Sequence, residues 1–258
     1  MSEGLTLFDL FEEFLDSLDD GERRQAERWI NLFKSYLATY GGIAVEEEEW
    51  AEEEGEDWPA PEPDLEDEDE GDAAAPWLFV PVDRLGEDHV ADFLGWYLVQ
   101  YVVLTTAEAG EAVAWVGRVL ESFHRAVGNT SGRRKDFDDL LQSLANDLPR
   151  VVQAKEVLTH AVQSGTMLPP FVRGRRVEGF QAGYFTVVEV GERGVLFDEV
   201  DRGTQLGPLP LPQYLKDLLR IGDTLNLELG LRGGVWSLLE VGHIYPPCIF
   251  IGEGEQGP

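Results

Sequence analysis

Basic residues close to aromatic residues are the part of this sequence whose chemistry is easiest to define. Guanidinium and ammonium groups bind phosphate oxygens, and neighbouring aromatic rings can stack on the bases of single-stranded nucleic acid. Such groups can equally contact a protein partner, and the alternative for the aromatic residues is that they fill a β-barrel core. Candidate contact residues form two basic clusters and an aromatic pair: Arg133, Arg134 and Lys135; Arg173, Arg175 and Arg176; Tyr184 and Phe185.

Residues for catalysis, metal binding or cofactor binding form no recognisable pattern. Gly252, Gly254 and Gly257 fit a G-x-G-x-x-G spacing, but we expect no helix after them to hold a phosphate at its N-terminus. The acidic run around Gly71 lacks the short ligands of a calcium loop. We therefore predict no enzymatic activity, no metal and no cofactor. The four histidines are expected to be capping, surface or core residues: His89, His124, His160 and His243.

Negative charge is concentrated in one segment of the 258-residue chain. The net charge is −30, and residues 46–72 contain 17 acids and no base, which leaves 33 acids against 20 bases elsewhere. Like charges repel and the segment has little apolar surface, so we predict a disordered insert over residues 46–76. Trp50 and Trp58 leave open a second interpretation, in which the insert docks on a basic groove.

Helical periodicity dominates the sequence outside the insert as far as residue 168. Apolar residues recur at three-and-four spacing over residues 7–18, 23–40, 87–104 and 106–127. Thr105 and Glu108 have the spacing of a capping box, which marks a helix start. Two further helices are predicted at 136–148 and 151–162, separated at Pro149. We expect residues 1–45 and 77–168 to form one helical domain.

Period-two alternation replaces the helical pattern after Pro169 and Pro170. Strands are predicted over residues 180–190, 194–201 and 203–209, then a short helix over 212–219, then a hairpin over 223–245 that turns at Gly233. This order resembles that of a five-stranded barrel of the OB type, with a helix between strands three and four. The predicted fold class is thus α+β: an α-helical N-terminal domain with a disordered acidic insert, a five-stranded OB-like barrel over 169–250, and a flexible tail over 251–258.

The N-terminal half resembles the helical core-binding domain of tyrosine recombinases and integrases. The resemblance rests on LFEEFLDSL, RRQAERWINLFKSYLATY, HVADFLGWYL and TAEAGEAVAWVGRVLESFHRAV, which follow one another in that order. In that family the helices clamp DNA through Lys and Arg. The family's catalytic domain is absent, because no H-x-x-R element follows Val127.

Taken together, these observations predict a non-enzymatic binding or adaptor protein whose partner is a protein. The alternative is a nucleic-acid-binding protein, with recombinase-like helices, an OB-like barrel and an acidic insert that acts as an autoinhibitor or DNA mimic. Overall acidity disfavours the second interpretation. No apolar run reaches the length of a membrane span, and the N-terminus has acids where a signal peptide needs bases, so a cytoplasmic location without a membrane is expected. Cys248 is the only cysteine, which excludes an intramolecular disulfide.

Overall fold

The computed structural model describes residues 5–41, 80–127, 131–165, 167, 172, 174–249 and 251. The chain divides into two units, of which the first is Met1–Gly86 with Ser122–Gly128 and the second is Glu87–Glu121 with Asn129–Pro258. The predictions of a disordered insert and a flexible tail fall almost entirely on residues outside the described ranges. Each unit is described separately below.

The first two stretches with helical periodicity form helices α1 (Leu7–Asp16) and α2 (Asp20–Thr39). A reciprocal capping box between Thr6 and Asp9 begins α1. At the start of α2 the Asp19 carboxylate accepts hydrogen bonds from the backbone N–H groups of Gly21 and Glu22. The apolar faces are buried, and the Phe11 and Phe33 rings meet edge to face with centroids 5.8 Å apart. Both helices predicted from the periodicity are therefore confirmed.

Residues 80–86 also belong to the first unit, and their first residues lie beside the start of α1. The Leu7 N–H donates to the Val80 carbonyl at 2.9 Å, and the Val82 N–H donates to the Leu5 carbonyl at 3.0 Å. A short 3₁₀ helix, η2, follows at Val82–Arg84. These two backbone hydrogen bonds hold residues 80–82 against the beginning of α1, although the two segments are far apart in the sequence.

The second unit begins with a helical stretch that widens in its middle. It consists of α3 (Glu87–Ala91), a π-helical segment η3 (Asp92–Tyr97) and α4 (Leu98–Tyr101). Gly95 lies in the π segment, where a Cβ atom would come 2.6 Å from Ile249 Cγ1, so glycine permits this close approach. After an extended connection, α5 (Thr106–Val127) begins at the predicted capping box, which Thr105 and Glu108 form in both directions.

Helix α6 (Ser131–Gln163) corrects the prediction of two helices separated at Pro149. The proline lies inside one continuous 33-residue helix. Proline removes one backbone hydrogen bond and crowds the preceding turn, but it does not prevent a helix whose flanking residues are buried. Leu144, Leu148, Val151 and Ala154 on either side are all buried, and this packing offsets the local cost.

The C-terminal part is a five-stranded antiparallel sheet with the order β3-β2-β1-β4-β5. The strands are β1 (Gly179–Gly191), β2 (Gly194–Glu199), β3 (Gln205–Leu209), β4 (Thr224–Arg232) and β5 (Val235–Tyr245), and the short helix α7 (Gln213–Lys216) lies between β3 and β4 as predicted. The β4–β5 hairpin lies within the predicted range of 223–245, and the alternating residues Leu225, Leu227 and Leu229 of β4 are all buried. The sheet is open, with β3 and β5 at its edges, so the prediction of a closed barrel is not confirmed.

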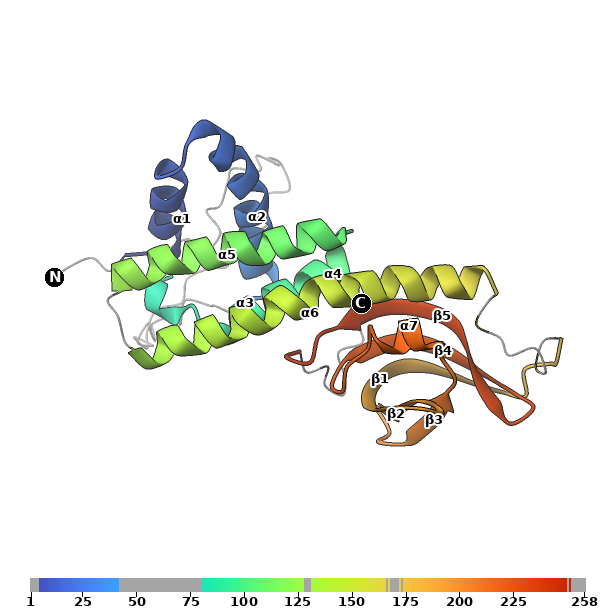
Figure 1. The fold of residues 1–258 in the computed structure, drawn as a ribbon. Coiled ribbons are helices and arrows are strands. Elements are labelled where there is room, and N and C mark those ends of the chain that lie inside the picture. The colour runs from blue at the N-terminus through green and yellow to red at the C-terminus, as the bar shows by residue number, and fades with distance from the viewer. Residues whose placement is uncertain are drawn as a thin grey trace, which may run out of the picture. The chain divides into compact units, whose positions relative to one another are not determined.

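Helix α6 belongs to the same unit as the sheet and packs along β5, as Figure 1 shows. The boundary predicted at Pro169 therefore falls inside the second unit. The periodicity of the sequence changes in this region because helix α6 ends at Gln163 and the first strand begins at Gly179. The periodicity alone does not show that α6 packs on the sheet along β5.

Candidate functional site

The first basic cluster lies in the first turns of α6. Arg134 is exposed, and its Nε lies 3.8 Å from an Asp138 carboxylate oxygen. The Arg133 guanidinium lies over the Phe137 ring at 6.0 Å. Lys135 is exposed. Part of the positive charge of this cluster is thus offset by a carboxylate one helical turn further on.

The second basic cluster lies near the turn between β4 and β5. Arg173 is outside the described residues, whereas Arg175 and Arg176 are exposed. The Arg175 carbonyl accepts a hydrogen bond of 2.7 Å from Arg232, and the Arg175 side chain lies against Gly233. The other cluster is at the beginning of α6, and Figure 1 places the β4–β5 turn beyond the opposite end of that helix. The structure does not bring the two clusters together.

The two aromatic candidates on β1 have different surroundings. Tyr184 is half-buried, with its ring centroid 6.2 Å from that of Tyr245. Phe185 is 0% exposed and meets Phe197 edge to face, so it fills the core and cannot stack on a base. This result corrects the assignment of Phe185 as a contact residue and agrees with the alternative that strand aromatics fill the core.

A groove that sequence reasoning missed lies in the second unit, with a volume of about 780 Å³. We call it the Val103 groove. One wall is residues 99–105, which comprise the end of α4 and the extended connection to α5. The other wall is the face of α6 from Val151 to Gln163, and β5 contributes His243 and Ile244. This volume is in the range of sites that bind small molecules or side chains of a partner.

The extended connection in this wall offers unpaired backbone groups. Val102 has φ −119° and ψ 129°, which is the conformation of a β-strand. Within the described part of the chain, the N–H groups of Val103 and Leu104 have no hydrogen-bond partner in the protein. The Val103 side chain is 97% exposed, and Tyr101 next to it is 47% exposed. An extended segment with free donors and an exposed apolar side chain can accept a second strand.

Lys155 and His243 form the polar centre of the groove. His243 Nδ1 lies 2.8 Å from the Val99 carbonyl oxygen and 3.3 Å from Lys155 Nζ. A carbonyl only accepts hydrogen bonds, so Nδ1 carries the proton. Burial lowers the pKa of His243, as does the nearby Lys155 charge, and the bond to Val99 opposes them. Burial also lowers the pKa of Lys155.

A second contact beside the groove joins β5 to α4. The Tyr245 hydroxyl donates to the Gln100 side-chain oxygen, and Tyr245 is completely buried. Together with the bond from His243 to Val99, it attaches the last turn of α4 to β5 at two places. The extended connection that follows α4 therefore starts from a fixed position.

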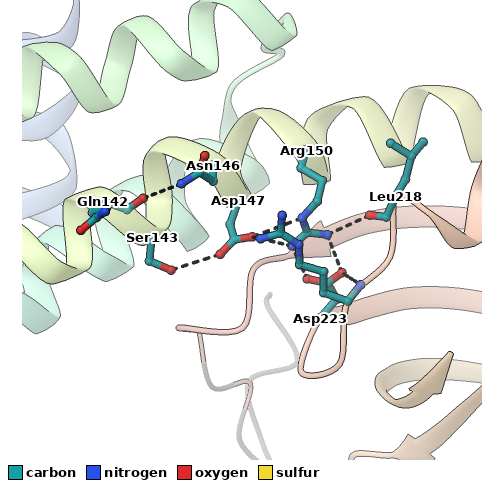
Figure 2. A network of polar contacts seen from close by, with 8 residues as sticks. Gln142, Ser143, Asn146, Asp147, Arg150, Leu218 and Asp223 are labelled. Atoms are coloured by element: carbon teal, nitrogen blue, oxygen red, sulfur yellow. Dashed lines mark hydrogen bonds and ion pairs between the residues drawn. The ribbon is translucent and has the colours of Figure 1, made fainter.

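A buried ionic cluster attaches α6 to the sheet, as Figure 2 shows. The Arg150 guanidinium donates to both carboxylate oxygens of Asp223 at 2.6 and 2.7 Å, to the Leu218 carbonyl at 2.8 Å, and to Asp147 at 3.0 Å. Arg220 donates to Asp147 at 2.5 Å. Burial acts to lower the pKa of Arg150, but the hydrogen bonds that it donates to Asp223 and Asp147, and the charges of these carboxylates, outweigh burial and raise the pKa. The cluster fixes the α6 wall of the groove relative to β4.

The sequence contains few signals for these residues. His243 was predicted to be a capping, surface or core histidine, and the structure places it at the polar centre of the groove. The capping box at Thr105 marked the start of α5, but the helical pattern predicted over 87–104 ends at Tyr101, and residues 102–105 form a connection that the sequence did not indicate. Among the residues that the structure describes, no three His, Cys, Asp or Glu side chains are arranged to hold a metal ion.

Comparisons with known proteins do not identify this chain. No protein-family model matches it, no curated protein matches it, and no solved structure matches it. Within the described ranges, none of the helices combines the length and the apolar composition needed to span a membrane.

Proposed function

We propose that this chain is a non-enzymatic binding protein and that the Val103 groove binds an extended segment of a partner protein. The observation that carries the proposal is the connection of residues 102–105, which begins in the β conformation at Val102. In it the N–H groups of Val103 and Leu104 have no partner among the described residues, and the Val103 side chain is 97% exposed. Val103 and Tyr101, which is 47% exposed, form an apolar patch beside the groove, and exposed apolar patches mark interaction sites.

The dimensions of the groove suit a short strand. Its α6 wall runs from Val151 to Gln163, which at 1.5 Å per residue is about 18 Å. An extended chain advances about 3.3 Å per residue, so five or six residues span that length. Main-chain hydrogen bonds to the connection would supply affinity, and side chains that enter the groove would supply selectivity.

The nucleic-acid alternative has less support. Phe185 lies in the core, and the basic clusters at Arg133 and Arg175 are apart. Part of the charge of the first cluster is offset by Asp138. The resemblance to recombinase core-binding domains, the OB-type barrel, the disordered insert and the cytoplasmic location remain predictions. The strand order and the position of α7 support the OB-type interpretation.

Panning of a random heptapeptide library against the full-length protein tests the proposal. We expect enrichment of peptides rich in β-branched and aromatic residues. Val103→Asp should abolish their binding, and Val103→Pro should weaken it because proline removes the amide donor and leaves the site apolar. Val177→Asp is the matched control, because Val177 is an exposed valine outside the groove. No enrichment, or equal binding by the Val103→Asp variant, would refute the proposal.

A further inference from the structure

Lys155 has an unusual position for a lysine in such an acidic chain. It is half-buried in the wall of the Val103 groove, and the structure gives it no salt bridge with any carboxylate of the described residues. Lys34 pairs with Glu12 at 3.3 Å, and Lys216 donates to the Gly191 carbonyl at 2.9 Å. A charged amine removed from much of its water and lacking an acidic partner is costly unless a ligand supplies one.

The neighbour of Lys155 cannot satisfy its charge. The Nδ1 proton of His243 is directed to the Val99 carbonyl, so this nitrogen cannot accept a hydrogen bond from the lysine. Among the other groove residues, Glu156 is the only acid, and it is exposed and pairs with no base of the described residues. His160 lies on the same helix and also lines the groove. Because Glu156 is exposed to water, the half-buried Lys155 amine is the charged group of the groove that a bound carboxylate would complement.

We infer that the partner segment bound in the Val103 groove carries an aspartate or glutamate side chain that pairs with Lys155, flanked by apolar residues on both sides. This inference rests on the proposed function and names the chemistry of the partner. A side-chain carboxylate fits better than a C-terminal one because Lys155 lies within the α6 wall and not at its end. A chain that ended at Lys155 would leave one side of the wall uncovered, either Thr159 to Gln163 or Val151 and Val152, depending on its direction.

Two displayed libraries separate the sources of the carboxylate. In the first, random heptapeptides lie between constant flanks and have no free terminus; in the second, they end in a free C-terminus. We expect the first library to yield apolar peptides with one acidic position on the full-length protein. A synthetic peptide with that acid should lose about tenfold in affinity when glutamine replaces it, as is usual for one hydrogen bond to a charged group.

The lysine variants connect that loss to a specific side chain. On Lys155→Met the acidic and glutamine peptides should bind equally, whereas Lys155→Arg should retain the preference for the acid. Lys34→Met is the control, because Lys34 is also partly buried, pairs with Glu12 and lies outside the groove. Circular dichroism of each variant establishes that it is folded before binding is measured.

The possible failures are distinguishable. Enriched apolar peptides without an acidic position, or an acid preference that survives Lys155→Met, would overturn the inference and leave the proposed function intact. Binding that requires a free C-terminus and is lost on amidation would overturn it in favour of a terminal carboxylate. The absence of any enriched peptide would overturn both.

Discussion

Removal of the Arg150 side chain should destabilise the second unit more than any comparable change on its surface. The guanidinium is 9% exposed and Asp223 is 0% exposed, so Arg150→Met leaves a buried carboxylate with only the Arg220 N–H, at 2.7 Å. Loss of one partner of a buried ion pair costs about 3–5 kcal/mol. We expect the urea midpoint for loss of β4 and β5 to fall accordingly. Hydrogen exchange read by mass spectrometry assigns the loss to these strands.

The double variant Arg150→Met with Asp223→Asn provides the control. Asparagine keeps an acceptor for the Arg220 N–H and removes the charge that would otherwise be stranded. We expect the double variant to recover about 2 kcal/mol of the unfolding free energy that Arg150→Met loses, as is common for residues in direct contact. Additive effects of the two substitutions, or a loss below about 1 kcal/mol for Arg150→Met, would show that the two side chains are not paired in a buried site.

Three further predictions concern the helix, the sheet and the groove. Pro149→Ala should raise the thermal midpoint of unfolding, because a proline inside a helix costs about 3 kcal/mol; a lower midpoint would mean that packing of the ring contributes more. Leu227→Asp should remove hydrogen-exchange protection from β4 and β5, because this residue is 1% exposed, while α1 and α2 keep theirs. Because the pKa of His243 is lowered in the folded protein, the unfolded chain binds a proton near pH 6.5 and the folded chain binds it only at lower pH. The contribution of neutral His243 to stability is therefore present above pH 6.5 and is lost as the pH falls through the folded pKa. His243→Gln should reduce that loss between pH 7 and pH 5 in urea titrations, by at most about 1.4 kcal/mol per pH unit, and equal slopes for the variant and the wild type would contradict the assignment.

The parts of the fold that depend on local patterns could be predicted from the sequence. The apolar spacing of α1 and α2, the capping box at Thr105 and the alternation of Leu225, Leu227 and Leu229 all correspond to elements of the structure. Each of these signals comes from residues within a turn or a strand of one another. The break predicted at Pro149 is wrong because the rule for proline considers the backbone alone, whereas burial on both sides of it maintains α6.

The sequence by itself determined where the charge lies and, apart from the break at Pro149 and the end of the helix at Tyr101, which segments are helices or strands. The tertiary structure decided the composition of the groove. Val103, Lys155 and His243 lie on three elements separated by about 50 to 90 residues, and nothing in their neighbours in the sequence relates them. They meet because α6 packs along β5 and because His243 and Tyr245 attach α4 to that strand. Contacts between distant segments depend on how buried surfaces fit together, and a local sequence pattern does not encode that fit.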